Sequence, residues 1–362
     1  MPDTEPQVAA APRLSVVTVS HDSRAELERS LPALAAQLRP EDELIVVDNA
    51  SSDGAAAAVA RLAPNATLLE TGANLGFAAG ANRGADAATG DLLLILNPDA
   101  HPLPGFRDGI ERPWVEGRGW AAWMGLVALE GGGEVNSAGN PLHFTGLTWA
   151  GGHGRPAVGL APGEVPIASG ACLAIPRRTF ERLGGFPEPF FLYHEDVDIS
   201  MRLHLEGEVV GFEPAAVVDH DYAFERRFEK MRFLERNRWG LVLRVYPGAL
   251  LALVLPALLL TELALIPISI SGGWGRQKLR ANIDVVRRLP WALRTRRRIQ
   301  GSRRVSAAEF SGWLTADLDS PFLGRASRSR PLRWGLRTYW AIVRCLLRAF
   351  SPAGPRGGSG SR

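Results

Sequence analysis

The residue cluster best suited to chemistry in this chain is acidic and directly follows an aromatic run, FFLY. It holds three carboxylates within four residues: Glu195, Asp196 and Asp198. On a helix, Glu195 and Asp198 share a face, and Arg202 lies four residues beyond Asp198 and can neutralise it. A carboxylate of the remaining pair, Glu195 and Asp196, can act as general base toward an acceptor hydroxyl. An acidic helix start that complements the helix dipole is the structural alternative.

Polar side chains also follow three apolar runs, each of which is typical of a buried strand. Ser20 ends the first run, Asp48 ends the second, and Asn97 begins the turn after the third. In an open parallel sheet, ligands bind where the carboxyl ends of the strands meet, so we expect these residues at one site. There Asp48 can accept hydrogen bonds from a ribose or a base. Each residue alone is equally compatible with a cap or a turn.

The segment 74–84, NLGFAAGANRG, contains groups suited to a diphosphate. Its glycines recur every fourth residue on one helical face, which permits close helix packing. Asn74, Asn82 and Arg83 are harder to explain by packing. Because a helix N-terminus after a strand end, with an arginine nearby, suits a diphosphate, we include these residues and Gly76 in the candidate site.

Asp99 and His220 are the candidate ligands of a divalent cation. A carboxylate at the end of a buried strand costs free energy of desolvation unless it is paired or binds a metal. A hard cation that bridges diphosphate oxygens would satisfy Asp99. His220 ends another short strand between two aspartates, which leaves metal binding open beside a purely structural role.

The elements that must position these residues follow from the spacing of apolar side chains. Strands are predicted at 14–20, 43–48, 66–71 and 91–96, and helices at 24–38, after residue 54 and at 77–88. This alternation predicts a parallel sheet with right-handed crossovers. A Gly-rich, loop-rich stretch at 129–165 precedes helices at 177–183 and 194–205, strands near 208–219, and a helical pattern from 224 with a break after Ile270.

Taken in order, several segments resemble the family-two glycosyltransferases, in particular their bacterial rhamnosyltransferase-like branch. They run over about residues 14–240: VVTVSHDS, IVVDNASSDG, NLGFAAGANRG, LLLILNPDA, ASGACLAIPRRTFERLGGFPEPFFLYHEDVDISMRL and ERNRW. The resemblance implies the α/β GT-A fold of nucleotide-diphospho-sugar transferases, a mostly parallel sheet flanked by helices, here with a helical C-terminal extension. It also implies inverting transfer of a sugar from a nucleotide diphosphate donor.

The resemblance further implies roles for individual residues. The donor-binding residues are Ser20, Asp48, Asn74, Gly76, Asn82, Arg83 and Asn97, the catalytic residues are Asp196 and Glu195, and the metal ligands are Asp99 and His220. Asp196 would be the base. Asn97 and Asp99 stand where the family often has Asp-x-Asp, which holds Mg²⁺ or Mn²⁺ on the diphosphate. Asn97 in place of the first aspartate lowers the negative charge that the protein places around the metal.

The expected mechanism is a single displacement. The base takes a proton from an acceptor hydroxyl, and that oxygen attacks the anomeric carbon in line, while the metal and Arg83 stabilise the departing diphosphate. One carboxylate base without a second nucleophilic carboxylate agrees with inversion. We expect a dTDP-rhamnose or UDP-sugar donor and a cell-envelope polysaccharide or glycolipid acceptor.

Charge divides the 362 residues into two parts. Residues 1–270 hold 21 Lys and Arg against 34 Asp and Glu, whereas residues 271–362 hold 20 against 4. Such a basic tail favours an anionic partner, and we expect lipid headgroups because no nucleic-acid recognition motif is present. Two cysteines exclude a disulfide framework. The predicted organisation is a disordered leader (1–12), a catalytic domain (13–245), a helical, basic, membrane-associated region (246–350) and a disordered tail (351–362).

Residues 249–270 carry one charge, Glu262, and their length could just span a bilayer. Pro256 and Pro267 argue against a simple span. Topology also argues against it, because the nucleotide-sugar site and the basic tail both belong on the cytoplasmic side. An interfacial segment and a helix packed on the enzyme are the remaining alternatives.

Residues 331–350 favour the interfacial alternative. Four arginines lie within about 60° of one another on a helical projection, away from an aromatic and aliphatic face: Arg333, Arg337, Arg344 and Arg348. This pattern is typical of a helix that lies on anionic lipid, and an oligomer interface is its alternative. We therefore expect a cytoplasmic protein on the inner face of the plasma membrane that contacts lipid through residues 249–350.

Two other function classes stay open from the sequence. One is a polyprenyl-phosphate sugar synthase or nucleotidyltransferase on a similar core, although a pyrophosphorylase should carry a Gly-rich loop with a basic residue where this chain has SHDSRAEL. The other is a catalytically inactive, sugar-nucleotide-binding scaffold at the membrane. A scaffold would keep its function in an Asp196→Asn variant, whereas an enzyme that uses this base would not.

Overall fold

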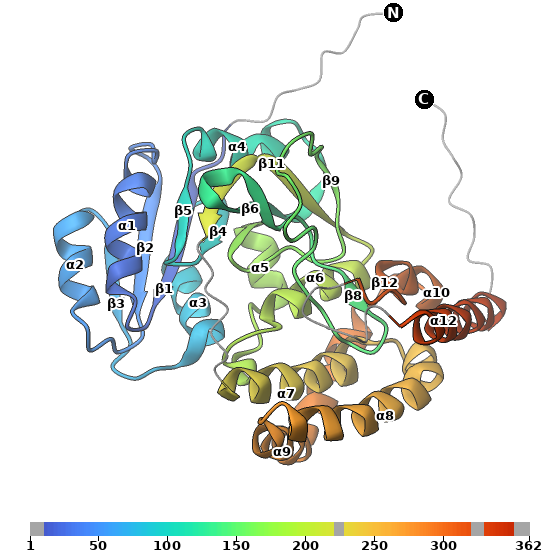
Figure 1. The fold of residues 1–362 in the computed structure, drawn as a ribbon. Coiled ribbons are helices and arrows are strands. Elements are labelled where there is room, and N and C mark those ends of the chain that lie inside the picture. The colour runs from blue at the N-terminus through green and yellow to red at the C-terminus, as the bar shows by residue number, and fades with distance from the viewer. Residues whose placement is uncertain (1–10, 221–227, 320–328, 351–362) are drawn as a thin grey trace, which may run out of the picture.

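The computed structural model describes residues 11–220, 228–319 and 329–350. Figure 1 shows a twisted sheet flanked by helices, with a group of long helices on one side of it. The sheet follows the order β3-β2-β1-β4-β10-β6-β11-β5. The predicted site residues lie at strand ends of this sheet, in and just before α3, and at the start of α6.

The first half of the sheet is parallel and matches the sequence prediction to within three residues. It contains β1 (Leu14–Ser20), β2 (Glu43–Asp48), β3 (Thr67–Glu70) and β4 (Leu92–Leu96), connected by α1 (Arg24–Ala35), α2 (Ala55–Leu62) and α3 (Gly76–Ala87). Every residue of β1 and β4 is buried, which is the pattern of strands covered on both faces.

The glycines of α3 allow this helix to lie directly on the sheet. A Cβ added at Gly80 would stand 2.7 Å from a methyl carbon of Val19, and one added at Gly84 would stand 2.3 Å from a methyl carbon of Val17. Both distances are shorter than carbon atoms tolerate. The packing role predicted for this glycine spacing is therefore confirmed.

The second half of the sheet is mixed. It contains β10 (Cys172–Pro176), β6 (Trp120–Leu129), β11 (Val209–His220) and β5 (Ala100–Pro102), with α4 (Phe106–Val115) packed on β11 and the short β7 (Glu134–Ser137) and β9 (Gly163–Glu164) paired to β6 and β11. β10 is antiparallel to β4 and β6, whereas β11 is parallel to β6. The sheet as a whole is mostly parallel, as expected. No element was predicted between residues 100 and 128, where the structure has β5, α4 and most of β6.

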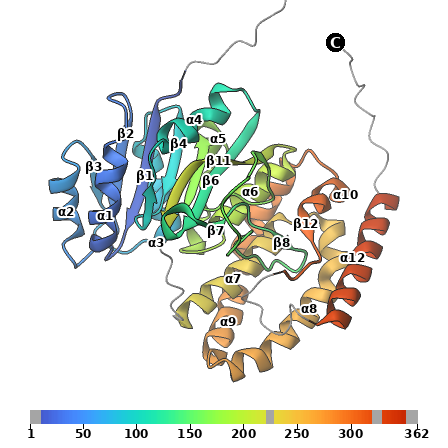
Figure 2. The same ribbon diagram turned by 45° about the horizontal axis from the view of Figure 1, so that its top comes forward.

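The remaining elements are mainly helical. After β10 come α5 (Arg177–Leu183), α6 (Glu195–Leu205), α7 (Phe228–Val245), α8 (Gly248–Ser271), α9 (Gly275–Gly301), α10 (Ala307–Phe310) and α12 (Arg330–Phe350). Short turns of 3-10 helix occur at Glu130–Gly132, Glu188–Phe190 and Ser311–Trp313, and β8 (Leu142–His143) pairs with β12 (Leu314–Thr315). Figure 2 shows α7, α8, α9 and α12 gathered on one side of the sheet. The predicted break after Ile270 is the turn between α8 and α9.

The helix α12 packs its apolar face on the protein. Trp340, Val343 and Leu347 are buried in a second core that these long helices share, and Trp340 stacks on Phe144 with ring centroids 5.0 Å apart. The expectation that this face rests on lipid is therefore wrong for these three side chains. Amphipathicity predicted that one face of the helix is covered, and the cover is the protein itself.

The helix α8 is anchored to α7 and α9 by buried charges. Its one acidic residue, Glu262, pairs with Arg238 of α7 and with Lys278 of α9, whose Nζ lies 2.6 Å from the Glu262 carboxylate. Glu235 of α7 completes the cluster, 3.0 Å from Arg238 and 2.5 Å from Lys278. Two acids and two bases balance, which satisfies charges that would be costly if left unpaired away from water.

Candidate functional site

The carboxyl ends of β1 and β2 bring Ser20 and Asp48 side by side, because the strand register pairs these two residues. Both are buried. The Asp48 carboxylate accepts a hydrogen bond of 3.3 Å from the amide of Ser51. This long bond leaves most of the acceptor capacity of the carboxylate for a ligand, as a hydrogen bond to a ribose or a base would require.

Asn49, directly after Asp48, joins the end of β2 to the start of α3. Its side-chain amide donates to the carbonyl oxygen of Gly76 at 3.0 Å, and its side-chain oxygen accepts from Thr71 at 3.3 Å. It thereby fixes the start of α3 against the end of β2.

The polar residues predicted around α3 differ in what they contact. The side-chain oxygen of Asn74 accepts a hydrogen bond of 2.9 Å from the amide of Gly76, in the turn that starts the helix. Asn82 exchanges two hydrogen bonds with the backbone of Phe186, at 3.0 and 2.8 Å. Arg83 is exposed on the helix. Asn82 therefore fixes α3 to the segment before α6, while Asn74 and Arg83 remain accessible.

Gly76 is required by its backbone conformation and by a close neighbour. Its φ angle is +82°, and an added Cβ would lie 2.5 Å from the ring and the carbonyl oxygen of Phe191. That same carbonyl accepts a hydrogen bond of 3.1 Å from the amide of Ala78. The start of α3 is thus bound to the loop that precedes α6.

Residues 169–171, just before β10, form a short turn that makes hydrogen bonds both to the residue after β4 and to the start of α6. The amide of Asn97 donates to the carbonyl oxygen of Ala171 at 3.1 Å, and the amide of Gly170 donates to the Asp196 carboxylate at 2.9 Å. Asn97 and Asp196, from elements about 100 residues apart in the chain, are therefore bound to neighbouring residues of one turn.

Glu195 and Asp196 form an acidic pair in which protonation is favoured. Burial raises the pKa of Asp196, although hydrogen bonds from the amides of Gly170 and Val197 act in the opposite direction. Burial and then the neighbouring Asp196 charge raise the pKa of Glu195 well above its usual range. Two adjacent buried carboxylates resist carrying two negative charges at once, so the pair favours a single charge. An ionised carboxylate with a raised pKa is a stronger base than a solvated one.

Asp99 and His220 meet through the pairing of β5 with β11, which sets His220 opposite Ala100. The Nε2 atom of His220 lies 3.1 Å from the Asp99 carboxylate. Burial acts to raise the pKa of Asp99, but the hydrogen bond and charge of His220 outweigh it and lower that pKa. The structure therefore brings both predicted metal ligands into direct contact.

This pair fits a divalent cation that also binds substrate. Within the described ranges, no group of three or more His, Cys, Asp and Glu side chains is arranged to hold a metal by itself. One carboxylate and one imidazole nevertheless provide an oxygen and a nitrogen ligand on adjacent strands. Mg²⁺ and Mn²⁺ sites in nucleotide-dependent enzymes commonly combine one or two protein ligands with phosphate oxygens, so the donor diphosphate can complete the set.

The loop before α6 has a strained backbone that α7 stabilises. Phe191, Tyr193 and His194 have φ angles of +66°, +70° and +69°, a region that residues other than glycine rarely adopt. The side-chain amide of Asn237 donates to the carbonyl oxygens of Phe190 at 3.0 Å and of Leu192 and Tyr193 at 2.8 Å each. We call these contacts the Asn237 clamp. No role for Asn237 follows from the sequence pattern, although this residue lies in the matching segment ERNRW.

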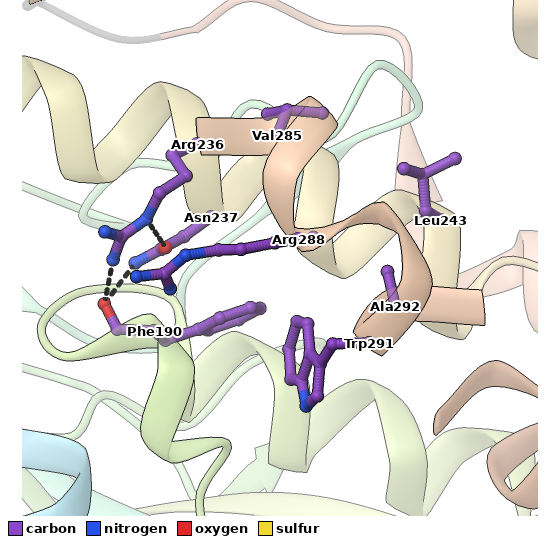
Figure 3. Close-up of a pocket in the computed structure, with 9 residues that line it drawn as sticks. Phe190, Arg236, Asn237, Leu243, Val285, Arg288, Trp291 and Ala292 are labelled. Atoms are coloured by element: carbon purple, nitrogen blue, oxygen red, sulfur yellow. Dashed lines mark hydrogen bonds between the residues drawn. The ribbon is translucent and has the colours of Figure 1, made fainter. Parts of the chain in front are cut away.

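Figure 3 shows the part of the Asn237 clamp at Phe190, beside α9. Arg236 also donates to the carbonyl oxygen of Phe190, at 2.5 Å, and the Phe190 ring packs edge-on against Trp291 with centroids 5.9 Å apart. A small hollow lies here between α7 and α9, and Arg288 lines it. None of the predicted donor, metal or catalytic residues lines this hollow, which is therefore distinct from the donor site.

A sequence-family model described as "Glycosyl transferase family 2" matches residues 15–184. The matched range includes Ser20, Asp48 and Asp99 and ends before Asp196 and His220. In Mycobacterium tuberculosis, the N-acetylglucosaminyl-diphospho-decaprenol L-rhamnosyltransferase is 30% identical over 238 residues, which cover 58% of this chain and 76% of that protein. The O-antigen biosynthesis protein RfbC of Myxococcus xanthus is 28% identical over 241 residues, which cover 60% of this chain and 18% of that protein.

One solved structure, GalNAc-T7 with UDP, GalNAc and Mn²⁺, superposes with a TM-score of 0.55 and 17% identity. The match covers 66% of this chain and 49% of that chain. At this level of identity the likeness shows a shared fold. Together with the family match and the mostly parallel sheet, it confirms the α/β GT-A fold expected from the sequence.

Proposed function

The chain belongs to glycosyl transferase family 2, and we propose that this glycosyltransferase transfers a sugar with inversion from a nucleotide diphosphate donor to a hydroxyl group of a glycolipid acceptor. The relative from Mycobacterium tuberculosis supports the acceptor class, since its name specifies a sugar linked through a diphosphate to a polyprenol. The same name makes rhamnose our first choice of transferred sugar.

The observation that carries the proposal is the position of Asp196. Its carboxylate accepts hydrogen bonds from the amides of Gly170 and Val197 at 2.9 and 2.8 Å, so its orientation is fixed by the backbone. It lies at the start of α6, bound to the same turn as Asn97 at the end of β4. Such a base lies beside the ligand-binding edge of the sheet, where an acceptor hydroxyl must meet the donor sugar.

In the proposed reaction, Asp196 accepts the proton of the acceptor hydroxyl. The acceptor oxygen forms a bond to the anomeric carbon, and the bond from that carbon to the diphosphate oxygen breaks. The nucleoside diphosphate leaves with the bonding electrons. A proton on the buried Glu195 would keep a second negative charge away from Asp196.

The donor would lie along the carboxyl ends of β1, β2 and β4. Asp48 and Ser20 are adjacent in the sheet and suit the nucleoside. Asn74, in the turn before α3, and Arg83, farther along the helix, are exposed and suit the diphosphate. Asp99 and His220 would hold the cation. A divalent cation there would neutralise charge that develops on the leaving diphosphate.

The decisive test compares Asp196→Asn with Asp86→Asn, the same chemical change at an exposed position of α3. Transfer is measured with dTDP-rhamnose and a panel of UDP-sugars, using N-acetylglucosaminyl-diphospho-polyprenol as acceptor. Loss of a positioned general base should reduce kcat by about 10²–10⁴-fold, while the nucleotide diphosphate still raises the melting temperature. Asp86→Asn should behave as wild type.

Two results would contradict the proposal. Turnover by Asp196→Asn within a few-fold of wild type would exclude Asp196 as the base. Product with retained anomeric configuration would exclude single displacement. For the metal, Asp99→Asn and His220→Ala should each raise the Mn²⁺ concentration needed for half-maximal nucleotide binding, and an unchanged Mn²⁺ requirement in both variants would exclude this pair as its ligands.

A further inference from the structure

The helix α8 exposes a continuous stripe of large aliphatic side chains. Its members recur at i, i+4, i+8, i+11 and i+15, within about 80° on a helical projection: Leu255, Leu259, Leu263, Ile266 and Ile270. Each is between 42% and 69% exposed. Among the described residues α8 is the one helix long and apolar enough to cross a membrane, yet only 17% of its most apolar window is buried in the protein.

The helix α9 also exposes aliphatic side chains and carries positive charge beside them. Five aliphatic side chains between 37% and 70% exposed form a second stripe: Leu279, Ile283, Val286, Leu289 and Leu293. Four exposed arginines fall within about 40° of one another along the edge of this stripe: Arg276, Arg280, Arg287 and Arg294. The turn at Gly272 and Gly273 joins the two helices, and both lie at the same end of the molecule (Figures 1 and 2).

The charges of this hairpin are arranged for an anionic surface. The acidic residues of α8 and α9 are Glu262 and Asp284, and both are buried or nearly so in ion pairs, Glu262 with Lys278 and Asp284 with Arg232. Their carboxylates therefore do not offset the exposed arginines. A basic row beside an aliphatic stripe is the pattern of helices that lie in a lipid headgroup region.

Glu262 determines how the hairpin can meet a bilayer. It is the fifteenth of the 24 residues of α8, and its carboxylate is bound to Arg238, Trp239 and Lys278 of the neighbouring helices. If α8 crossed the hydrocarbon core, these partners would have to enter it or give up their charged contacts, and either is expensive. The middle of α8 is therefore held at the surface of the protein.

We propose that the α8–α9 hairpin binds the surface of an anionic lipid bilayer, with both aliphatic stripes inserted at the headgroup level and both helix axes parallel to the membrane. The proposal concerns attachment and is independent of which sugar is transferred. It narrows the lipid contact expected of residues 249–350 to α8 and α9. It also places the catalytic domain within reach of acceptors that are themselves dissolved in the membrane.

The first experiment measures binding of the full-length chain to vesicles of phosphatidylglycerol and phosphatidylcholine by co-sedimentation. Leu259→Glu and Val286→Glu together should lower the partition coefficient by at least about tenfold, because both insert a charge into the aliphatic stripes. Val158→Glu is the matched control, since Val158 is 79% exposed and lies outside the hairpin. Replacing Arg280, Arg287 and Arg294 by glutamine should weaken binding to anionic vesicles and reduce its salt dependence.

A second experiment distinguishes an in-plane helix from a spanning one. Single cysteines replace Leu255, Leu263 or Ile270 in a Cys345→Ser background, in which Cys172 is fully buried, and each carries a fluorophore whose depth is measured with spin-labelled lipids. The three positions should report equal, shallow depths. A label at Leu263 that is much deeper than the two others would show a spanning helix and overturn the proposal.

Two further outcomes would also overturn it. Vesicle binding by the Leu259→Glu, Val286→Glu protein equal to that of wild type would show that the stripes do not contact lipid. A wild-type dimer in solution that ignores vesicles and that these substitutions convert to a monomer would assign the stripes to a second copy of the chain.

Discussion

The Asn237 clamp makes a quantitative prediction about the loop that leads into α6. We expect Asn237→Ala to destabilise the protein and to slow the transfer reaction. The side chain has two N–H donors, and they serve three backbone carbonyls at 2.8 to 3.0 Å, so one donor is shared. Asn237 is nearly fully buried, so the carbonyls released by the substitution gain little compensating water.

The size of the effect follows from these contacts. At about 1 kcal/mol for each N–H donor, the substitution should cost about 2 kcal/mol of unfolding free energy, with more if the freed carbonyls stay dry. For a chain of 362 residues, about 2 kcal/mol corresponds to a fall in Tm of roughly 3 °C, at about 2.1 cal/mol/K of unfolding entropy per residue. The loop leads directly into Glu195 and Asp196, so kcat should fall while the KM for the donor changes little.

Asn237→Asp isolates the role of the donors. It preserves the size of the side chain and the oxygen that accepts from Arg236 at 2.9 Å, but sets an oxygen against the loop carbonyls. It should therefore lose at least as much kcat as Asn237→Ala. Denaturant unfolding and steady-state kinetics measure the two effects. If both variants remain within about 0.5 kcal/mol and twofold in kcat of wild type, the clamp does not position the base.

Three further predictions concern buried or strained groups. Burial raises the pKa of Glu195, so the folded protein holds this proton more tightly than the unfolded chain, and the stability it contributes at low pH is lost as pH rises through the folded-state pKa. Glu195→Gln should accordingly raise Tm at pH 8, with a gain that disappears toward about pH 4.3, the usual pKa of glutamate; an equal gain at every pH would contradict this reasoning. Gly76→Ala should cost more than about 1 kcal/mol in denaturant unfolding, because of its left-handed backbone and the contact with Phe191, and a neutral result would refute that strain. Glu262→Ala should cost roughly 3–5 kcal/mol because it removes a partner of the buried Arg238, and calorimetry that finds less than about 1 kcal/mol would show that the ion cluster is dispensable.

The sequence predicted those parts of the fold that depend on local pattern. Apolar runs located β1, β2, β3 and β4, and the glycine spacing of α3 predicted its contact with the sheet. The polar residues at the ends of these strands came together because parallel strands share one edge. Such features need no knowledge of distant partners.

Features that depend on distant partners were not predicted from the sequence. The insertion of β10 between β4 and β6 is an antiparallel pairing across the middle of the sheet, and no local pattern encodes it. The resemblance placed Asp99 and His220 at one metal site, but the register of β5 and β11 that brings them into contact joins strands more than 100 residues apart. The Asn237 clamp similarly joins residues 44 to 47 positions apart. Amphipathicity indicated that one face of α12 is covered but could not identify the cover.

One turn of α7 carries two sets of contacts with consecutive residues. Glu235 and Arg238 bind the charged groups of α8 and α9, while Arg236 and Asn237 bind the loop before α6. Separation of the hairpin from α7 therefore disturbs the same turn that holds the loop before α6, and hydrogen exchange should find the two regions opening as one cooperative unit. Any ligand that favours packing of the hairpin on α7 also favours the ordered loop. Because such coupling is reciprocal, acceptor binding at the loop should in turn tighten attachment through the hairpin.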